Sequence, residues 1–257
     1  LDNFISNILK TLCAEQENFK TYGHMLNILM SYNPEIIITP LYKKPQKRDD
    51  QILLGNKGYF LKQLYSLNFP VPPGFVLTTE IFRCLEAILG YKEIYRDMNM
   101  RLERELKKLE KITRRRYGHP QNPLLLSVRS GSAISLPGMM SSFLNVGINE
   151  EIAEGLSQKK GYAWAAWDCY RRFLQFWGMS EGLDRDFFDE IIDDFKEKYK
   201  VSKKLYFTPD QMREIALAYR KALENNGIAV EDDPNEQLRK AVFKVIESWH
   251  SPRAELY

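Results

Sequence analysis

One short apolar run constrains the fold of this chain more than any other feature. Residues Leu124–Val128 follow Pro123 and lead directly into Arg129. An apolar run of this length, bounded by turn-forming residues, predicts a buried strand. The Ser- and Gly-rich residues 130–142 then predict a loop, and Phe143–Val146 predicts a returning strand. The sequence therefore places an arginine where a strand enters a loop.

Amphipathic helices are predicted over most of the remaining chain, because apolar residues recur there every three or four positions. In the helix expected over residues 92–116, the inward residues are Leu102, Leu106, Leu109 and Ile112. The later stripes are Trp164, Trp167, Tyr170, Leu174 and Trp177; Phe187, Ile191, Phe195 and Tyr199; and Leu238, Ala241, Val242, Val245, Ile246 and Trp249. We interpret these stripes as core packing. The predicted fold class is therefore α+β and helix-rich.

A change in composition predicts a domain boundary near Gln51. Residues 33–50 contain three prolines and a run of charged residues, which is typical of a linker. We therefore expect residues 1–50 to be a helical lead-in and linker from a preceding region. Residues 51–257 are expected to form a second unit, with a helical insert over about residues 150–200.

Charge does not indicate a particular partner. The formal net charge is only +3, although residues 92–116 hold ten basic against five acidic residues. Residues 181–198 show the reverse, with eight acidic against three basic residues. Interleaved charges are typical of solvated helix faces rather than of nucleic-acid-binding surfaces. We therefore expect no nucleic acid partner, and no metal site among the acidic residues between 184 and 197.

Cysteine usage and hydropathy indicate a cytoplasmic protein. Cys13, Cys84 and Cys169 lie far apart and form no C-x-x-C pair, so the pattern predicts neither a disulfide framework nor a zinc site. A reducing compartment is the simplest location for such a chain. No apolar run approaches the length of a membrane span, and we expect no membrane partner.

The segment Gly55–Gly58 contains Lys57 between two glycines. Glycines allow a backbone to approach a ligand closely, and a lysine supplies a mobile cation, so the segment suits a phosphate. It lacks the spacing of a Walker A loop. An ordinary glycine turn with a solvated lysine explains the same residues.

Two further segments suit phosphate binding. In Ser127–Ser132, the guanidinium of Arg129 can bind phosphate oxygens through paired hydrogen bonds, although an arginine that merely reaches solvent at a strand end is an equal alternative. The segment Leu136–Asn145 offers backbone N–H groups around Gly138. Its methionines, Met139 among them, either pack on a flat base or fill a gap in the core.

Taken in order, these segments resemble the nucleotide-binding domain of the pyruvate phosphate dikinase and phosphoenolpyruvate synthase family. The matching stretches are Gly55–Gly58, Phe69–Phe75, Ser127–Gly131, Leu136–Asn145, Trp167–Phe173 and Trp249–Ala254 with Tyr257. Together they cover about residues 51–257, whereas residues 1–50 match nothing in the family. The form of the Pro137–Met140 loop resembles the dikinases more than the synthases.

The resemblance implies an ATP-grasp-like domain. In this family ATP phosphorylates a carrier histidine on another domain, and a barrel domain then passes the phosphoryl group to pyruvate. By the same resemblance Lys57 contacts the ATP phosphates, and Arg129 acts as the catalytic residue that stabilises the transferring phosphoryl group. Gly138, Met139 and Ser142 are expected to line the nucleotide loop.

The resemblance also implies that Mg²⁺ accompanies ATP, with its acidic ligands mainly downstream of Tyr257. On that basis we expect the isolated chain to be inactive, and its partners to be the phosphohistidine carrier domain and the pyruvate-binding barrel of the same protein. A homodimer is compatible with the pattern. None of His24, His119 and His250 lies in a segment like the phosphorylated one.

Two departures from the family's pattern favour an alternative. Asn56 stands where the family often has glycine, and Ser141–Ser142 stand where it often has Asp-Thr. These differences are compatible with a non-catalytic regulatory or interaction domain that retains the fold.

Overall fold

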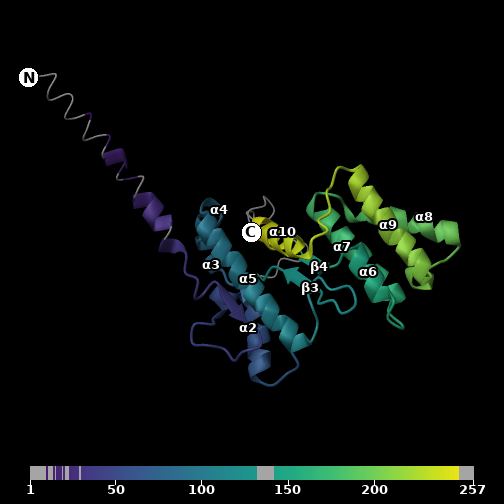
Figure 1. Cartoon of the computed structure of the whole chain (residues 1–257), viewed down its shortest axis with the longest axis horizontal. Helices are drawn as coiled ribbons and strands as arrows, with labels where there is room; N and C mark the ends of the chain where they lie inside the picture. The colour runs from purple at the N-terminus through teal and green to yellow at the C-terminus, as the bar shows by residue number, and fades with distance from the viewer. Residues whose placement is uncertain are drawn as a thin grey trace, which may run out of the picture. The chain divides into compact units, whose positions relative to one another are not determined.

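The computed structural model describes Lys10, Ala14, Lys20 and residues 16–18, 23–28, 30–131 and 142–248. Its contacts divide the chain into two compact units, Leu1–Glu105 and Leu106–Tyr257. The described residues are mostly helical (Figure 1). They also contain two small antiparallel sheets, which is compatible with the predicted α+β class.

The unit Leu1–Glu105 contains one two-stranded sheet and several helices. After the helical residues 23–28, the elements are β1 (Ile38–Pro40), α2 (Gln51–Ser66), β2 (Phe75–Leu77), α3 (Glu80–Arg83), α4 (Leu85–Gly90) and the first part of α5 (Lys92–Thr113). The strand β2 coincides with the short apolar run Phe75–Leu77. Thr79 does not cap the following helix, because its hydroxyl donates instead to the Ile52 carbonyl at 3.2 Å.

Residues 36–49 contribute to this sheet and to its core, although their composition is that of a linker. Strand β1 pairs antiparallel with β2, in a register that places Thr39 opposite Val76. The Thr78 backbone N–H donates to the Ile37 carbonyl at 3.0 Å, and Ile37 is fully buried. The segment before Gln51 thus forms a strand, because backbone pairing outweighs its proline content here, and the expected boundary near Gln51 stays a prediction.

The unit Leu106–Tyr257 is built around helix α7. Its elements are the end of α5, β3 (Leu126–Arg129), β4 (Ser142–Val146), α6 (Glu150–Ser157), α7 (Ala163–Ser180), α8 (Arg185–Tyr199), the 3₁₀ turn η1 (Lys204–Tyr206), α9 (Pro209–Asn225) and α10 (Pro234–Glu247). Helix α7 contacts α6, α8, α9 and β4, and α10 contacts β3 and β4 (Figure 1). The run of helices α6–α9 extends past residue 200, where we expected the insert to end.

Most of the predicted apolar stripes form the core. The residues of α7 that were expected to be buried, from Trp167 to Trp177, are at most 3% exposed, and Leu238–Ile246 supply the buried face of α10. Two details differ. Ile112 is 48% exposed in the last turn of α5, and the fully buried aromatic residue of α8 is Phe188 rather than Phe187.

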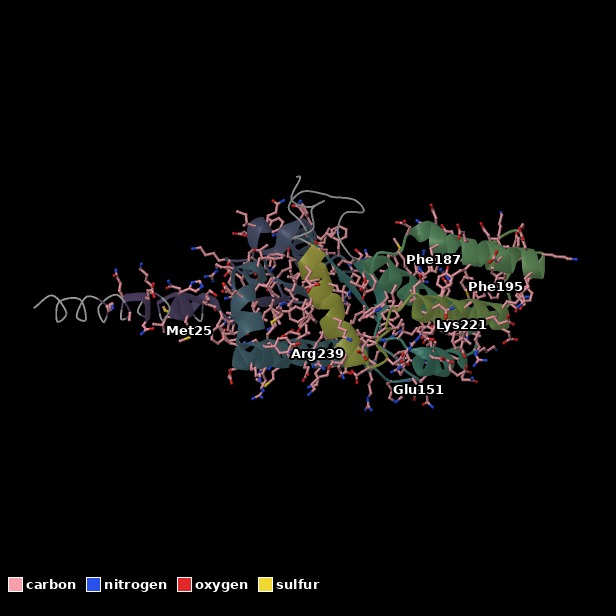
Figure 2. All side chains as sticks on the ribbon, turned by 90° about the horizontal axis from the view of Figure 1, so that it is seen from above. Met25, Glu151, Phe187, Phe195, Lys221 and Arg239 are labelled. Atoms are coloured by element: carbon pink, nitrogen blue, oxygen red, sulfur yellow. The ribbon has the colours of Figure 1, made fainter. Side chains whose placement is uncertain are left out.

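The aromatic stripe of α8 is shifted by one residue from the expected position. Phe188 and Ile192 are the buried residues of this helix, whereas Phe187 and Phe195 are half-buried. Figure 2 labels Phe187 and Phe195 along α8, which runs beside α9. The shift accompanies the packing of Phe188 against Tyr219 on α9, whose ring centroids lie 5.0 Å apart.

A buried glutamine joins the end of β4 to the start of α10. The Gln237 Oε1 accepts from the Gly147 N–H at 2.9 Å, and its Nε2 donates to the carbonyls of Ile148 at 2.8 Å and Glu231 at 2.7 Å. Gly147 has φ 97°, and a Cβ atom there would lie 2.4 Å from the Tyr117 ring. Position 147 thus combines a left-handed backbone with a close contact to Tyr117, and only glycine accommodates both.

Replacing Gly147 with alanine is expected to destabilise the Leu106–Tyr257 unit by about 2–4 kcal/mol, because backbone strain and overpacking both contribute. Urea denaturation followed by circular dichroism measures the change. Gly227→Ala is the matched control, because Gly227 has φ 71° but no atom near its Cβ position. An equal loss in both variants would contradict a role for the Tyr117 contact.

No helix among the described residues is long and apolar enough to cross a membrane.

Candidate functional site

Lys57 follows a break in helix α2. Asp50 caps the start of the helix, because its side chain accepts a hydrogen bond from the Leu53 N–H at 2.7 Å. The helical dihedrals are interrupted at Gly55, whose φ of 67° and ψ of 164° lie in a region open essentially to glycine alone. Lys57 is exposed in the first turn after the break. Gly55 therefore marks a kink within α2, and an exposed lysine lies two residues after it.

Gly58 brings α2 close to the sheet. It is buried, and a Cβ atom at this position would lie 2.9 Å from the Val76 Cγ2 of β2. Real Cβ atoms do not approach carbon this closely, so a larger residue would push the helix away from the strand. The glycine pattern predicts a close approach between this backbone and a ligand. At Gly58 the group that approaches the backbone is the side chain of Val76.

Arg129 and Ser142 lie side by side on the antiparallel hairpin of β3 and β4. The register makes them direct partners across the two strands. Side chains of directly opposed residues project from the same face, with Cβ atoms about 4.5–5.5 Å apart. Arg129 is exposed and Ser142 half-buried, whereas the next pair, Val128 and Phe143, faces the core. The structure therefore brings together two residues that the sequence analysis had selected separately.

The loop between these two strands begins at Ser130 and Gly131. Gly138 and Met139, which were expected to line the nucleotide loop, lie outside the described residues. Arg129 and Ser142 are the last and first residues of their strands, so they flank the segment 130–141 that connects β3 to β4.

Lys57 belongs to the unit Leu1–Glu105, whereas Arg129 and Ser142 belong to Leu106–Tyr257. That Lys57 and Arg129 contact the same ATP molecule stays a prediction.

A buried ion pair that was not predicted from the sequence involves the same helix as Lys57. Lys62 Nζ lies 2.5 Å from Asp49 Oδ2, and the two side chains are 2% and 1% exposed. Lys62 also donates to the Thr39 hydroxyl at 3.3 Å. Asp49 lies in the charged run before α2, whose composition indicates a linker, so the sequence offered no signal for a buried carboxylate.

The environment of Asp49 favours its charged form. Burial alone would raise the pKa of this carboxyl. The hydrogen bond from the Gln46 N–H at 2.8 Å and the bond and charge of Lys62 act in the opposite direction, so the pKa lies below its ordinary value. The pair is therefore an ionic contact that ties the segment before α2 to the helix that carries Lys57.

A second buried charged cluster lies on α7. Arg171 is 4% exposed and pairs with Asp168 at 2.8 Å, while the Lys204 Nζ lies 3.1 Å from the same carboxylate oxygen. Arg171 also donates to Gln175 at 3.1 Å and to the Tyr219 hydroxyl at 3.4 Å. All of these partners are protein groups, so the cluster ties α7 to α9 and to the turn after α8.

The acidic residues of α8 do not converge on a metal site. Asp186, Asp189, Glu190, Asp193, Asp194 and Glu197 are exposed. Within the part of the chain that the structure describes, no group of three or more His, Cys, Asp or Glu side chains is arranged to hold a metal ion.

Known proteins resemble most of this chain. It is 38% identical over 210 residues to "Pyruvate, phosphate dikinase" of Giardia intestinalis, a match that covers 80% of this chain and 23% of that protein. The protein of the same name from Clostridium symbiosum is 36% identical over 210 residues, covering 80% and 24%. The chloroplastic protein of Flaveria pringlei is 37% identical over 212 residues, covering 82% and 22%.

The chain spans about a quarter of the length of these relatives. No protein-family model matches it. The resemblance to the dikinases that the motifs indicated is confirmed by the extent of these matches.

Proposed function

On the premise that this chain is related to a segment of the pyruvate, phosphate dikinases over four fifths of its length, we propose that it is an ATP-binding module with an ATP-grasp-like fold. In the proposed reaction, the module positions ATP for phosphorylation of a carrier histidine on another domain. The phosphoryl group then serves the interconversion of pyruvate and phosphoenolpyruvate.

The pairing of Arg129 with Ser142 supports this proposal more than any other observation. A guanidinium donates two parallel hydrogen bonds to phosphate oxygens, and a serine hydroxyl beside it adds a third donor. Both side chains belong to the same face of the hairpin, next to the connecting segment whose sequence includes Gly138 and Met139. An anion bound at this face would therefore meet several donors at once.

The proposed roles follow from the charge of the transferring group. Phosphoryl transfer depends mainly on positioning and on neutralisation of the phosphate oxygens. We assign Arg129 to the transferring phosphoryl group, and Lys57 and Ser142 to binding of the triphosphate. The described residues provide no carboxylate cluster of the kind that Mg²⁺ prefers, and we assign no step of the reaction to the metal ion through this chain.

Titration of the isotope-labelled chain with ATP tests the proposal by NMR. We expect the backbone signals of Arg129 and Ser142 to shift on addition of ATP. Arg129→Ala should weaken ATP binding about tenfold to a hundredfold, because a hydrogen bond to a charged group is lost. Far-UV circular dichroism should remain unchanged, since Arg129 is exposed.

Arg115→Ala is the matched control for this titration, because Arg115 is an exposed arginine of the same unit and lies outside the hairpin. It should bind ATP as the unchanged chain does. Equal affinities in the Arg129→Ala and unchanged chains would contradict the assigned role of Arg129. Absence of any ATP-induced shift would favour a regulatory or interaction domain instead.

A further inference from the structure

Strand β4 buries two residues whose spacing does not fit a regular strand. Phe143 and Val146 are both 0% exposed, although they are three positions apart. Successive side chains of a strand point to opposite faces, so residues three apart normally lie on opposite faces. One extra residue must therefore be inserted between them.

The register of the hairpin contains this insertion. Leu126 is paired with Val146, and Val128 is paired with Phe143. Two steps along β3 thus correspond to three steps along β4, which defines a β-bulge in β4. Within the bulged segment Asn145 has φ 58°, a left-handed conformation that asparagine tolerates better than most residues.

The bulge determines which residue stands beside Arg129. Beyond the bulge, Arg129 is paired with Ser142. If the register of the Leu126–Val146 pair continued without a shift, Phe143 would lie opposite Arg129 instead. The bulge therefore permits two buried residues on β4 and also places a hydroxyl, rather than a phenyl ring, next to the guanidinium.

The side chain of Asn145 anchors the bulge to the helical core. Its Nδ2 donates to the Cys169 carbonyl of α7 at 3.0 Å. The following residue, Val146, is buried, and β4 contacts α7. A left-handed asparagine is often no more than a feature of local folding. Here its position on the strand also sets the partner of Arg129.

We propose that Asn145 is a positioning residue for anion binding, because the left-handed bulge at Asn145 sets the register that places Ser142 beside Arg129. The expected effect on anion binding rests on the proposed function. The register of the hairpin can be measured whether or not the chain binds ATP. The ligand in question is a phosphate group of a nucleotide.

Two substitutions distinguish the effect of the backbone conformation at Asn145 from the effect of its side chain. Asn145→Gly keeps the left-handed conformation accessible and removes the bond to Cys169, whereas Asn145→Val disfavours that conformation strongly. We expect Asn145→Gly to retain the register and to bind ATP within about threefold of the unchanged chain. Asn145→Val should shift the register and weaken ATP binding by about tenfold or more.

Disulfide trapping measures the register directly. Cysteines in Arg129→Cys/Ser142→Cys can form a disulfide only when the two residues are partners, because a one-residue slip turns the two side chains to opposite faces of the hairpin. Oxidation and peptide mapping should detect this bridge with Asn145 or Asn145→Gly, and should detect little of it with Asn145→Val. If Asn145→Val does not fold, as judged by thermal melting, Asn145→Ala replaces it with the same expected direction.

The outcomes distinguish the two proposals. Equal trapping in the Asn145, Asn145→Gly and Asn145→Val backgrounds would overturn the positioning role, and so would loss of trapping in Asn145→Gly. If trapping follows the expected pattern while ATP binding is the same in every variant, including Arg129→Ala, the proposed function fails and the control of register by Asn145 stands.

Discussion

Replacing Lys62 with alanine is expected to destabilise the Leu1–Glu105 unit by about 3–5 kcal/mol, because Asp49 would remain buried without its cation. Such a loss is a large part of the roughly 5–15 kcal/mol that stabilises a typical domain. The Lys62 and Asp49 side chains are almost fully buried, so solvent cannot replace the missing ammonium without local opening. Urea denaturation, monitored by far-UV circular dichroism, measures the change.

Lys57→Ala is the matched control, because Lys57 is an exposed lysine on the same helix. Its effect on stability should be within about 0.5 kcal/mol. A second control replaces both partners, as in Lys62→Met with Asp49→Leu, and should restore much of the loss, since a buried ion pair contributes little beyond a well-packed apolar pair. If Lys62→Ala were as stable as Lys57→Ala, the buried pair would not be a structural contact.

The same variant should respond to pH in a defined direction. In the unchanged chain the pKa of Asp49 is lowered, so its contribution to stability is present above about pH 4 and is lost as the pH falls through the lowered pKa. In Lys62→Ala burial dominates and raises that pKa, so protonation relieves the buried charge. The difference in stability between the two chains should therefore narrow from pH 7 to pH 4. A constant difference would show that the lost energy is not electrostatic.

Replacing Trp177 with alanine is expected to destabilise the Leu106–Tyr257 unit by about 3–5 kcal/mol, because a large buried ring leaves a cavity. Trp177 is 1% exposed, and its ring centroid lies 5.5 Å from that of Phe173 and 5.9 Å from that of Phe143. Its Nε1 also donates to the Ala229 carbonyl at 3.1 Å. The single residue thus joins α7, β4 and the segment before α10.

The Trp177 prediction can be checked by urea denaturation of the variant. Met179→Ala is the control, because Met179 lies on the same helix and is 38% exposed. We expect that control to lose less than a third as much stability as Trp177→Ala. Trp177→Phe should retain most of the packing and lose the hydrogen bond to Ala229, at a cost of about 1 kcal/mol. Comparable losses in Trp177→Ala and Met179→Ala would contradict the central position of Trp177.

Local pattern predicted most of the helices and strands. Strand β3 follows from the apolar run that ends at Arg129. The core face of α7 follows from helical spacing. These elements have periods that the sequence displays directly. Strand β1 could not be found in this way, because its three residues gain their stability from pairing with β2.

The candidate site was predictable in its residue types but not in its geometry. Arg129 and Ser142 were selected from separate motifs, and their pairing depends on a bulge that the alternation of residues in β4 does not reveal. The burial of Lys62 depends on Asp49, thirteen positions away in a charged segment. Contacts of this kind arise from tertiary packing, and no local pattern encodes them.

The ion pair between Asp49 and Lys62 has a practical consequence for producing shorter versions of this chain. A version starting at Gln51, as the proline-rich composition suggests, would lack both the carboxylate that Lys62 contacts and the strand that pairs with β2. The buried ammonium of Lys62 on α2 would then lack its counter-charge. Strand β2 would lose its pairing partner and expose an edge that is prone to aggregation. A shorter chain that folds should therefore begin upstream of Ile36.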